Sequence, residues 1–320
     1  MSAPHPPASP FSRRRFLKAT ALAAGSIGSG CLPLQPTAAP GDILDTHTHF
    51  YDPRRPGGVP WPPPENRELH RPVLPAEYET LARPLGIRGT VIVEASPLIP
   101  DNDWILALLQ QNPFLTGFIG HLRPADDSFP NDWRRLSRDP AFRGIRTGGW
   151  DGPVDIRRPK FIPHCRLIAE QGRILEVLIG PELLPDIARL AEAVPHLPMV
   201  IDHCANLRID GQQPPAEWLR GMDACARHPH IHVKFSGLVE GSGRTRGDAP
   251  DDVNFYRPVL DALWERFGSQ RLIFGSNWPV STLFAPLDRV VRIARSYLDS
   301  RGRDASIRCL RTNAQHLYRV

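Results

Sequence analysis

His47 and His49 lie two residues apart in the segment Asp45-Thr46-His47-Thr48-His49. Alternate side chains of an extended strand point to the same side, so both imidazoles would face a single metal ion or a single substrate. A third histidine, His203, ends the apolar run Pro198–His203. Three histidines with one open water position form a catalytic zinc site, whereas histidines without a metal act as general bases. These three residues are therefore the first catalytic candidates.

Further polar side chains fall near the ends of other short apolar runs, and they are Glu94, His121, Arg123, Arg146, Glu176, Lys234, Ser236 and Asn277. Arg123 and Arg146 would suit a substrate that carries a carboxylate. Glu94 and Glu176 are also candidates for substrate binding. An alternative interpretation pairs one of the arginines with a glutamate, so that the pair only holds the strand ends together.

Two polar residues are not counted as catalytic. For Lys234, a salt bridge that lines the interior is favoured over a catalytic role. Asp202 alternates with His203 and is therefore expected to point the other way along the strand. Glu176 lies in the middle of its run, and if it faces inward it must be paired or protonated.

These residues need a scaffold, and the apolar runs predict it. Eight runs are expected to be strands: Ile43–His47, Thr90–Ala95, Gly117–Leu122, Gly144–Thr147, Ile174–Ile179, Pro198–His203, His232–Ser236 and Leu272–Gly275. Helix-like segments lie between them, and a final helix is expected over Ala305–Leu317. Eight strand–helix repeats predict a (β/α)8 TIM barrel, in which the chemistry sits where strands end. A doubly wound sheet would normally carry a glycine-rich phosphate loop, and we find none.

Two long loops are expected to cover the mouth of the barrel. The segment Tyr51–Pro75 contains eight prolines and Trp61, so it is stiff and offers an aromatic surface to a substrate ring. The segment Gly237–Asp252 is rich in glycine and charge and would serve either as a mobile lid or as surface decoration.

The amino-terminal segment 1–40 is set apart from the barrel as a leader. Its Ser12–Lys18 stretch is typical of a twin-arginine signal, which would engage the twin-arginine export machinery. Cys31 follows a loose lipoprotein cleavage box, so we expect either a lipid anchor at this cysteine or cleavage near Ala39. The protein would then be periplasmic or anchored to the membrane. Residues 41–320 have the size of a single barrel domain.

The basic net charge of the chain comes mainly from this leader. The formal charge is +5 for all 320 residues. Residues 1–40 hold four basic side chains and no acid, so the remainder carries +1. This balance argues against a nucleic-acid partner. The four later cysteines, Cys165, Cys204, Cys225 and Cys309, fit no zinc spacing and are expected to be buried free thiols.

Five segments together resemble the amidohydrolase superfamily, and they are Asp45–His49, Phe142–Arg146, Val200–His203, Val233–Leu238 and Phe274–Val280. The last four are similar to its amidohydrolase-2 subgroup, in particular to the L-fuconolactonase and 2-pyrone-4,6-dicarboxylate lactonase branch. The resemblance implies hydrolysis of a lactone or other cyclic ester of a sugar acid or small carboxylic acid. It also implies that a carboxylate at the end of the eighth strand activates water, without a required metal. Histidines and an arginine or lysine would polarise the carbonyl.

Asn277 departs from the pattern of that subgroup, which usually has aspartate at this place. An amide cannot accept a proton at any working pH, although it can orient water or donate to an oxyanion. Three interpretations follow. In the first, the chain is a hydrolase whose base is one of the three histidines or a glutamate, Glu94 or Glu176, and it needs no cofactor.

The second interpretation is a metal-assisted amidohydrolase or decarboxylase, in which His47, His49 and His203 hold one zinc ion that supplies hydroxide. Against it, the fourth strand offers no lysine that could be carbamylated, and the fifth offers no histidine ligand. The third interpretation is a barrel that binds a sugar acid or lactone without turning it over.

Replacing Arg13 and Arg14 by lysine should leave the precursor in the cytoplasm, because the export route recognises the arginine pair. Cell fractionation and immunoblotting of the full chain check this, with the double change Arg134→Lys and Arg135→Lys as the matched control. Unchanged recovery from the periplasm or membrane would contradict the export signal.

Overall fold

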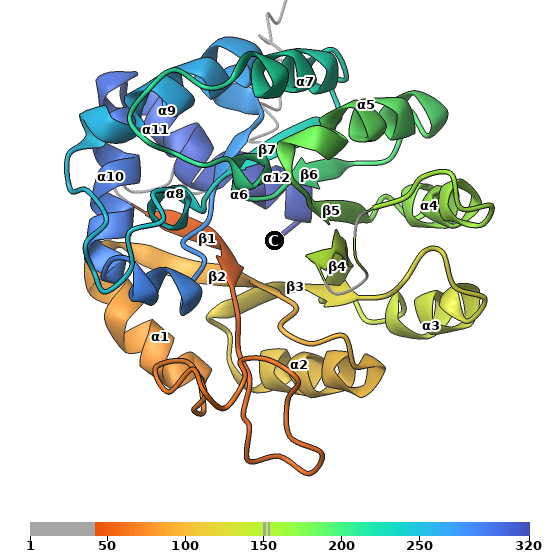
Figure 1. Ribbon diagram of the computed structural model, residues 1–320. Coiled ribbons are helices and arrows are strands. Elements are labelled where there is room, and N and C mark those ends of the chain that lie inside the picture. The colour runs from red at the N-terminus through yellow and green to blue at the C-terminus, as the bar shows by residue number, and fades with distance from the viewer. Residues whose placement is uncertain (1–41, 150–151, 153) are drawn as a thin grey trace, which may run out of the picture. The chain divides into compact units, whose positions relative to one another are not determined.

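Eight parallel strands lie beside one another in the order of the sequence (Figure 1). The computed structural model describes residues 42–149, 152 and 154–320. The strands are β1 Ile43–Thr48, β2 Ile87–Val93, β3 Leu115–His121, β4 Phe142–Gly148, β5 Ile174–Leu178, β6 Met199–Ile201, β7 Ile231–Phe235 and β8 Leu272–Phe274. All eight expected strands are confirmed. Strand β2 begins three residues earlier than expected, because Arg88 and Gly89 interrupt the apolar pattern while Ile87 still pairs with Ile43 of β1.

The first and last strands meet through side chains as well as backbone. Thr46 Oγ1 donates a hydrogen bond to Phe274 O over 2.7 Å, and Asp45 Oδ1 accepts one from Ser276 N over 2.8 Å. Thr48 and Trp278 form a parallel bridge. Polar residues of the expected β1 motif therefore bring the two ends of the sheet together.

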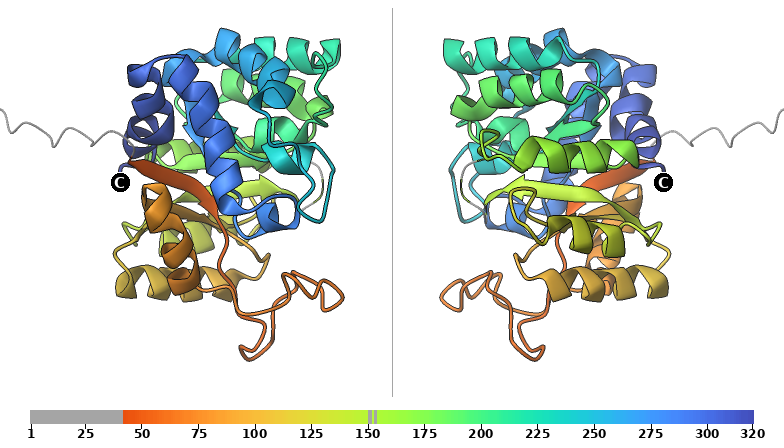
Figure 2. Two further views of the ribbon diagram at one scale, coloured as in Figure 1. Left: turned by 90° about the vertical axis from the view of Figure 1, so that its left-hand side faces the viewer. Right: turned by 90° about the vertical axis from the view of Figure 1, so that its right-hand side faces the viewer.

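Helices cover the outside of the strands (Figures 1 and 2). The longer ones are α1 Pro75–Ala82, α2 Ile99–Gln111, α3 Phe129–Leu136, α4 Phe161–Glu170, α5 Leu184–Ala193, α7 Ala216–Ala226, α9 Val253–Phe267 and α10 Leu287–Ser300. Two short turns, α6 His203–Asn206 and α8 Leu238–Gly241, follow β6 and β7. The alternation of strand and helix confirms the (β/α)8 barrel.

The end of the chain differs from the single helix expected over Ala305–Leu317. It forms α11 Arg303–Ile307, a π-helical turn Arg308–Thr312 and α12 Asn313–Tyr318. Helix α12 contributes Tyr318 to the barrel interior, where this side chain is buried together with Leu44, Ile174 and other strand residues. The chain end thus closes the barrel near the beginnings of the strands.

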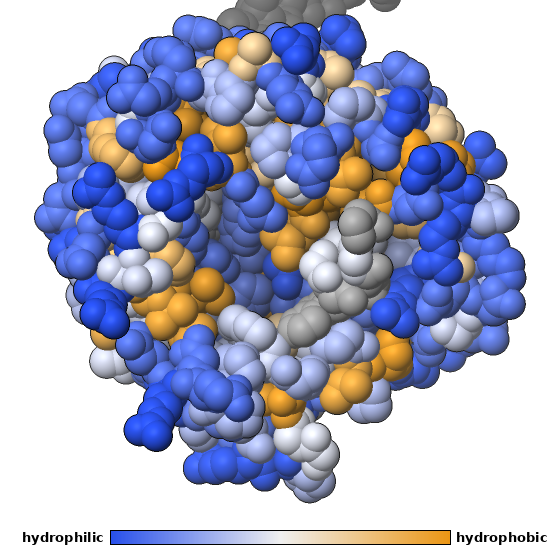
Figure 3. Space-filling model, in the orientation of Figure 1, coloured by the Kyte–Doolittle hydropathy of each residue, from blue (hydrophilic) through white to orange (hydrophobic). Residues whose placement is uncertain are grey.

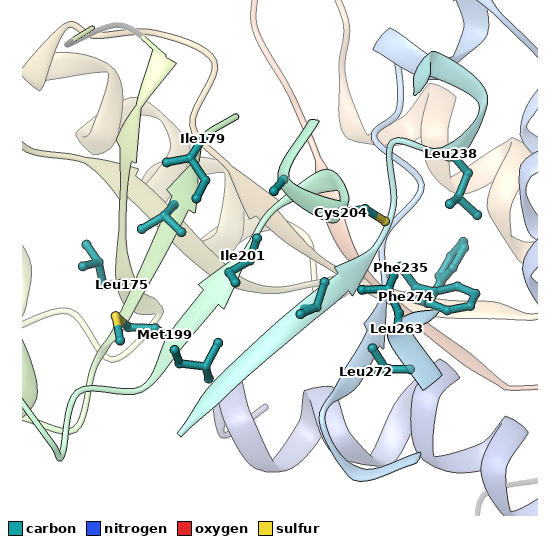
Figure 4. Close-up of a cluster of buried hydrophobic side chains, with 14 of the residues drawn as sticks. Leu175, Ile179, Met199, Ile201, Cys204, Phe235, Leu238, Leu263, Leu272 and Phe274 are labelled. Atoms are coloured by element: carbon teal, nitrogen blue, oxygen red, sulfur yellow. The ribbon is translucent and has the colours of Figure 1, made fainter. Parts of the chain in front are cut away.

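The apolar residues form two layers, as expected for parallel strands that are covered on both faces. The outer layer packs between strands and helices, and Figure 4 shows part of it, with Leu175, Ile201 and Phe235 among the labelled side chains. The inner layer fills the barrel beside Tyr318. The core is therefore apolar at one end of the barrel, which leaves the other end for polar groups.

Several expectations concern features outside the core. Cys165, Cys204, Cys225 and Cys309 are buried free thiols, as expected. Within the described part of the chain, no helix combines the length and the hydropathy that crossing a bilayer requires. The twin-arginine stretch and Cys31 lie outside the described residues.

Candidate active site

A pocket of about 370 Å³ opens where the strands end. Its lining residues are His49, Trp61, Glu94, Ala95, Arg146, Gly149, Leu178, His203, Asn277 and Val280. Figure 3 shows a hollow near the centre of this face, with hydrophobic side chains gathered around it. Six of the residues singled out in the sequence, from five strand ends and the Tyr51–Pro75 loop, therefore share one cavity.

His49 stands directly after β1 and has partners on both ring nitrogens. Its Nδ1 lies 3.0 Å from Val93 O and 3.1 Å from Glu94 O, and since carbonyl oxygens only accept, Nδ1 carries the hydrogen. Its Nε2 lies 3.2 Å from Asn277 Oδ1. Burial, with a contribution from Arg146, lowers the pKa of His49 to about 3. The ring is therefore neutral at ordinary pH, with a lone pair on Nε2.

His47 points to the same side of β1 as His49, as expected, and the two ring centres lie 4.9 Å apart. It is nevertheless fully buried and lies beneath the pocket lining. Its Nδ1 is 3.1 Å from Lys234 Nζ, and its ring centre is 4.3 Å from that of His203. Burial and the neighbouring cations lower the pKa of His47 far below its usual range. His47 thus supports the two histidines that reach the pocket.

His203 reaches the pocket through an unusual turn. The residues His203–Asn206 all have positive φ, between 48° and 58°, which is a left-handed turn that L-residues rarely adopt. Gly237 is also left-handed, and a Cβ there would come within 2.5 Å of His203 Cβ. His203 Nδ1 lies 2.9 Å from Ser236 Oγ. Among the described residues no group hydrogen-bonds to His203 Nε2, so this atom is open to a ligand.

The same turn corrects the expectation for Asp202. Strand β6 ends at Ile201, so strict alternation does not continue to His203. Asp202 points into the barrel, where its Oδ1 lies 3.2 Å from Lys234 Nζ and 3.7 Å from His47 Nδ1. The alternation rule failed here because it assumes that an extended backbone runs through both residues.

Lys234 is the centre of a fully buried set of charges below the pocket. Its Nζ donates to Glu176 Oε2 over 2.5 Å and also contacts Asp202 and His47. Tyr318 donates to the other oxygen of Glu176 over 2.5 Å. Burial raises the pKa of Glu176 to about 7. Glu176 is therefore inward-facing and paired, and it lies in the barrel interior rather than on the pocket wall.

Arg146 and Arg123, which the sequence suggested as a pair, occupy different cavities. Arg146 Nε donates to Glu94 Oε1 over 2.7 Å, and its Nη2 donates to Glu94 O over 3.0 Å. This contact matches the alternative in which an arginine pairs with a glutamate. Arg123 is half exposed and lines a separate cavity of about 200 Å³ with Asp126 and Arg158.

Asn277 follows β8 in a left-handed conformation with φ of 57°. Its Nδ2 donates to Glu240 Oε1 over 2.9 Å, while its Oδ1 faces His49. Glu240 belongs to α8, and burial raises its pKa to about 7. Sequence reasoning missed Glu240 because no motif or periodicity marks it. The only signal was its place in the loop Gly237–Asp252.

Three described side chains could hold a metal ion, namely His47, Asp202 and His203, whose ligand atoms all lie within 4.8 Å of one another. Asp202 thus takes the place that the sequence assigned to His49. Both Asp202 oxygens lack a hydrogen-bond donor among the described residues, which favours a nearby cation. However, the ammonium of Lys234 already contacts both Asp202 and His47. Because a divalent ion would have to stand beside this ammonium, the donors do not fit one while Lys234 keeps its position.

The chain is an eight-stranded parallel TIM barrel with histidines and a buried charge network at its strand ends, which is where enzymes of this fold carry their active sites. The model of the amidohydrolase family matches residues 44–320, and the chain belongs to this family. L-fucono-1,5-lactonase of Burkholderia ambifaria is 31% identical over 283 residues, which cover 87% of this chain and 95% of the relative. L-fucono-1,5-lactonase of Burkholderia multivorans is 26% identical, over 81% of this chain and 89% of the relative.

Solved structures show the same fold. An amidohydrolase from Burkholderia multivorans with bound zinc superimposes with a TM-score of 0.78 at 24% identity, covering 87% of this chain and 99% of the other. A probable 2-pyrone-4,6-dicarboxylic acid hydrolase from Acinetobacter baumannii gives a TM-score of 0.70 at 16% identity, over 87% and 100%. At these identities the likeness concerns the fold.

Replacing Lys234 by methionine should lower the free energy of unfolding by about 3–5 kcal/mol, because Glu176 and Asp202 would remain buried without their cation. Urea denaturation monitored by tryptophan fluorescence measures this. Lys160, the other lysine among the described residues, pairs with Asp127 on the surface, so Lys160→Met is the matched control and should change little. Equal effects of the two variants would show that the buried network does not hold the barrel together.

Proposed function

We propose that the protein hydrolyses a lactone by attack of a water molecule that His203 deprotonates. The observation that carries this proposal is the open Nε2 of His203 on the pocket wall, beside Asn277 and His49. The names of the two Burkholderia relatives, both L-fucono-1,5-lactonases, support the choice of a lactone. Asn277 does not replace the base, because an amide cannot take up a proton.

The residues of the pocket and its surroundings supply the base and the positive group that this reaction needs. Burial, with contributions from Arg146 and Lys234, lowers the pKa of His203 well below its usual value, so the ring is neutral before reaction. When Ser236 Oγ accepts a hydrogen bond from Nδ1, the lone pair of His203 lies on Nε2 and takes one proton from water as the water attacks. The water oxygen bonds to the lactone carbonyl carbon, and the Arg146 guanidinium stabilises the negative charge that develops on the carbonyl oxygen. The bond from the carbonyl carbon to the ring oxygen then breaks. His203 returns its proton to that oxygen, and the product is an open hydroxy acid.

We further propose that this reaction needs no divalent metal. Lys234 and Arg146 already supply positive charge at Asp202 and His47, the atoms that a metal would use. In this scheme the ammonium holds Asp202 and His47 in place, and the guanidinium polarises the carbonyl.

The pocket favours an uncharged substrate with one apolar face. Trp61, Ala95, Leu178 and Val280 supply apolar surface. Arg146 already pairs with Glu94, and no other cation belongs to the described lining. A lactone of a sugar acid meets these conditions because its acid group is tied up in the ring. We therefore propose a sugar lactone rather than a pyrone dicarboxylate.

The leader 1–40 supports the further proposal that the single barrel domain, residues 41–320, acts after twin-arginine export, in the periplasm or anchored through Cys31. Its substrate would then be a small molecule that is available outside the cytoplasm.

Replacing His203 by asparagine should lower kcat for a neutral sugar lactone by about 10²–10⁴, because the general base is lost. Asparagine is chosen because it tolerates the left-handed backbone of this position. A pH-indicator assay over a panel of sugar lactones measures the effect, and His316→Asn, on an exposed histidine of α12, is the control. An unchanged kcat in His203→Asn would assign the base elsewhere. No turnover by the unmodified protein would leave a binding protein instead of an enzyme.

Removal of metal should leave lactone hydrolysis unchanged. Protein that has been treated with a chelator and dialysed is compared with untreated protein, and metal content is measured by mass spectrometry in both. Added zinc should not raise the rate, because Lys234 already contacts the atoms that would bind it. A loss on chelation that zinc restores would favour the metal-assisted alternative.

A further inference from the structure

Glu240 is a carboxyl group with a single side-chain partner in the part of the chain that the structure describes. Its Oε1 accepts the hydrogen bond of Asn277 Nδ2 over 2.9 Å. No described cation forms an ion pair with it. The titratable groups that face it are Cys204 of α6 and Tyr256 of α9, and burial raises the pKa of both, that of Cys204 to about 12. Both groups therefore remain neutral in the pH range where Glu240 titrates. Asn277 is the contacting side chain whose hydrogen bond changes when Glu240 gains or loses a proton.

The other side of the Asn277 amide is equally constrained. His49 Nδ1 donates to the carbonyls of Val93 and Glu94 at the end of β2, so a neutral His49 presents an acceptor at Nε2. The amide lies between this nitrogen and the Glu240 carboxyl group. One end of the amide is a donor and the other an acceptor. The amide can therefore stand in either of two orientations. An ionised Glu240 and the lone pair on His49 Nε2 both require the Nδ2 end, so each of these neighbours favours a different orientation.

The protonation of Glu240 decides between these orientations. An ionised Glu240 can only accept, so it draws Nδ2 toward itself and leaves Oδ1 facing His49 and the pocket, which is the arrangement in the structure. A protonated Glu240 can donate to Oδ1, and the amide then turns Nδ2 toward Nε2 of His49. Only the first orientation presents an oxygen that can accept a hydrogen bond from a water molecule in the pocket.

We propose that Glu240 is a positioning residue that sets which end of the Asn277 amide faces the pocket, and that its carboxylate form presents Asn277 Oδ1 to the attacking water. This role in hydrolysis rests on the lactonase activity proposed above. The orientation itself does not, since it follows from the contacts of Glu240, Asn277 and His49.

The direction of the pH effect follows from the sign of the titration. Burial raises the pKa of Glu240 to about 7, so the carboxylate form is populated above that pH and lost below it. Lactone hydrolysis should therefore rise with pH through this range. In Glu240→Gln, which cannot ionise, this limb of the pH profile of kcat should disappear.

Nuclear magnetic resonance tests the orientation without any assay of activity. Protein labelled with ¹⁵N on asparagine shows the Asn277 side-chain amide, which is assigned by its absence in Asn277→Asp. We expect its chemical shift to titrate with a midpoint near 7, the pKa of Glu240, and to stay constant with pH in Glu240→Gln. Glu265→Gln, on the exposed side of α9, is the matched control and should titrate like the unmodified protein. The same titration in Glu240→Gln, or none in the unmodified protein, would overturn the proposal.

A stability measurement provides a second test that does not depend on Glu240→Gln alone. The substitution Asn277→Asp places a second carboxyl group against that of Glu240. Because two negative charges repel each other, the pKa of one of these two carboxyl groups is raised. This variant should lose stability as pH rises above the usual carboxyl range, and the double variant Asn277→Asp with Glu240→Gln should recover it. Absence of recovery would show that the two side chains do not act as a pair. If no lactone is hydrolysed, these two tests still decide the role of Glu240, while the proposed function fails separately.

Discussion

The ion pairs of Lys234 with Glu176 and Asp202 are the interaction on which the rest of the centre depends. All three side chains are fully buried, and a buried charge is tolerated only when it is paired. The ammonium also contacts His47, whose ring packs against His49 and His203. The network therefore fixes the floor of the pocket and the two histidines that reach it. It also places positive charge beside His47 and Asp202, two of the three described side chains that could hold a metal ion.

Backbone geometry supplies the second constraint. The turn His203–Asn206 and the residue Asn277 both adopt left-handed conformations, which cost free energy in L-residues and are found where function or packing requires them. The first turn directs Asp202 into the barrel and His203 into the pocket. Trp218 stabilises it by donating to Cys204 O over 2.9 Å, and Asn206 by donating to Ile179 O over 3.0 Å. The pocket residues are thus held by the surrounding structure rather than by their own preference.

An amide at position 277 changes how the pocket is organised. A carboxylate there would be a base and a charge, whereas Asn277 links two groups on opposite sides, His49 and Glu240. In the proposed mechanism the base, His203, and the group that orients water, Asn277, are separate residues. This division is compatible with the family and with relatives that are lactonases, because lactone hydrolysis needs a base, an oriented water and a positive group near the carbonyl, whichever side chains supply them.

The sequence by itself determined the fold and most of the pocket. Apolar runs with polar ends located all eight strands, and because strand ends converge in a barrel, His49, His203, Arg146, Glu94 and Asn277 had to meet. Tertiary structure alone decided the partners of these residues. Periodicity says nothing about a left-handed turn, so the direction of Asp202 was predicted wrongly. The distance between Glu240 and Asn277, which follow the neighbouring strands β7 and β8, depends on how the two segments after these strands pack against each other. The separation of Arg123 from Arg146 has the same origin, because adjacent strands bring two side chains near each other without fixing which cavity each one enters.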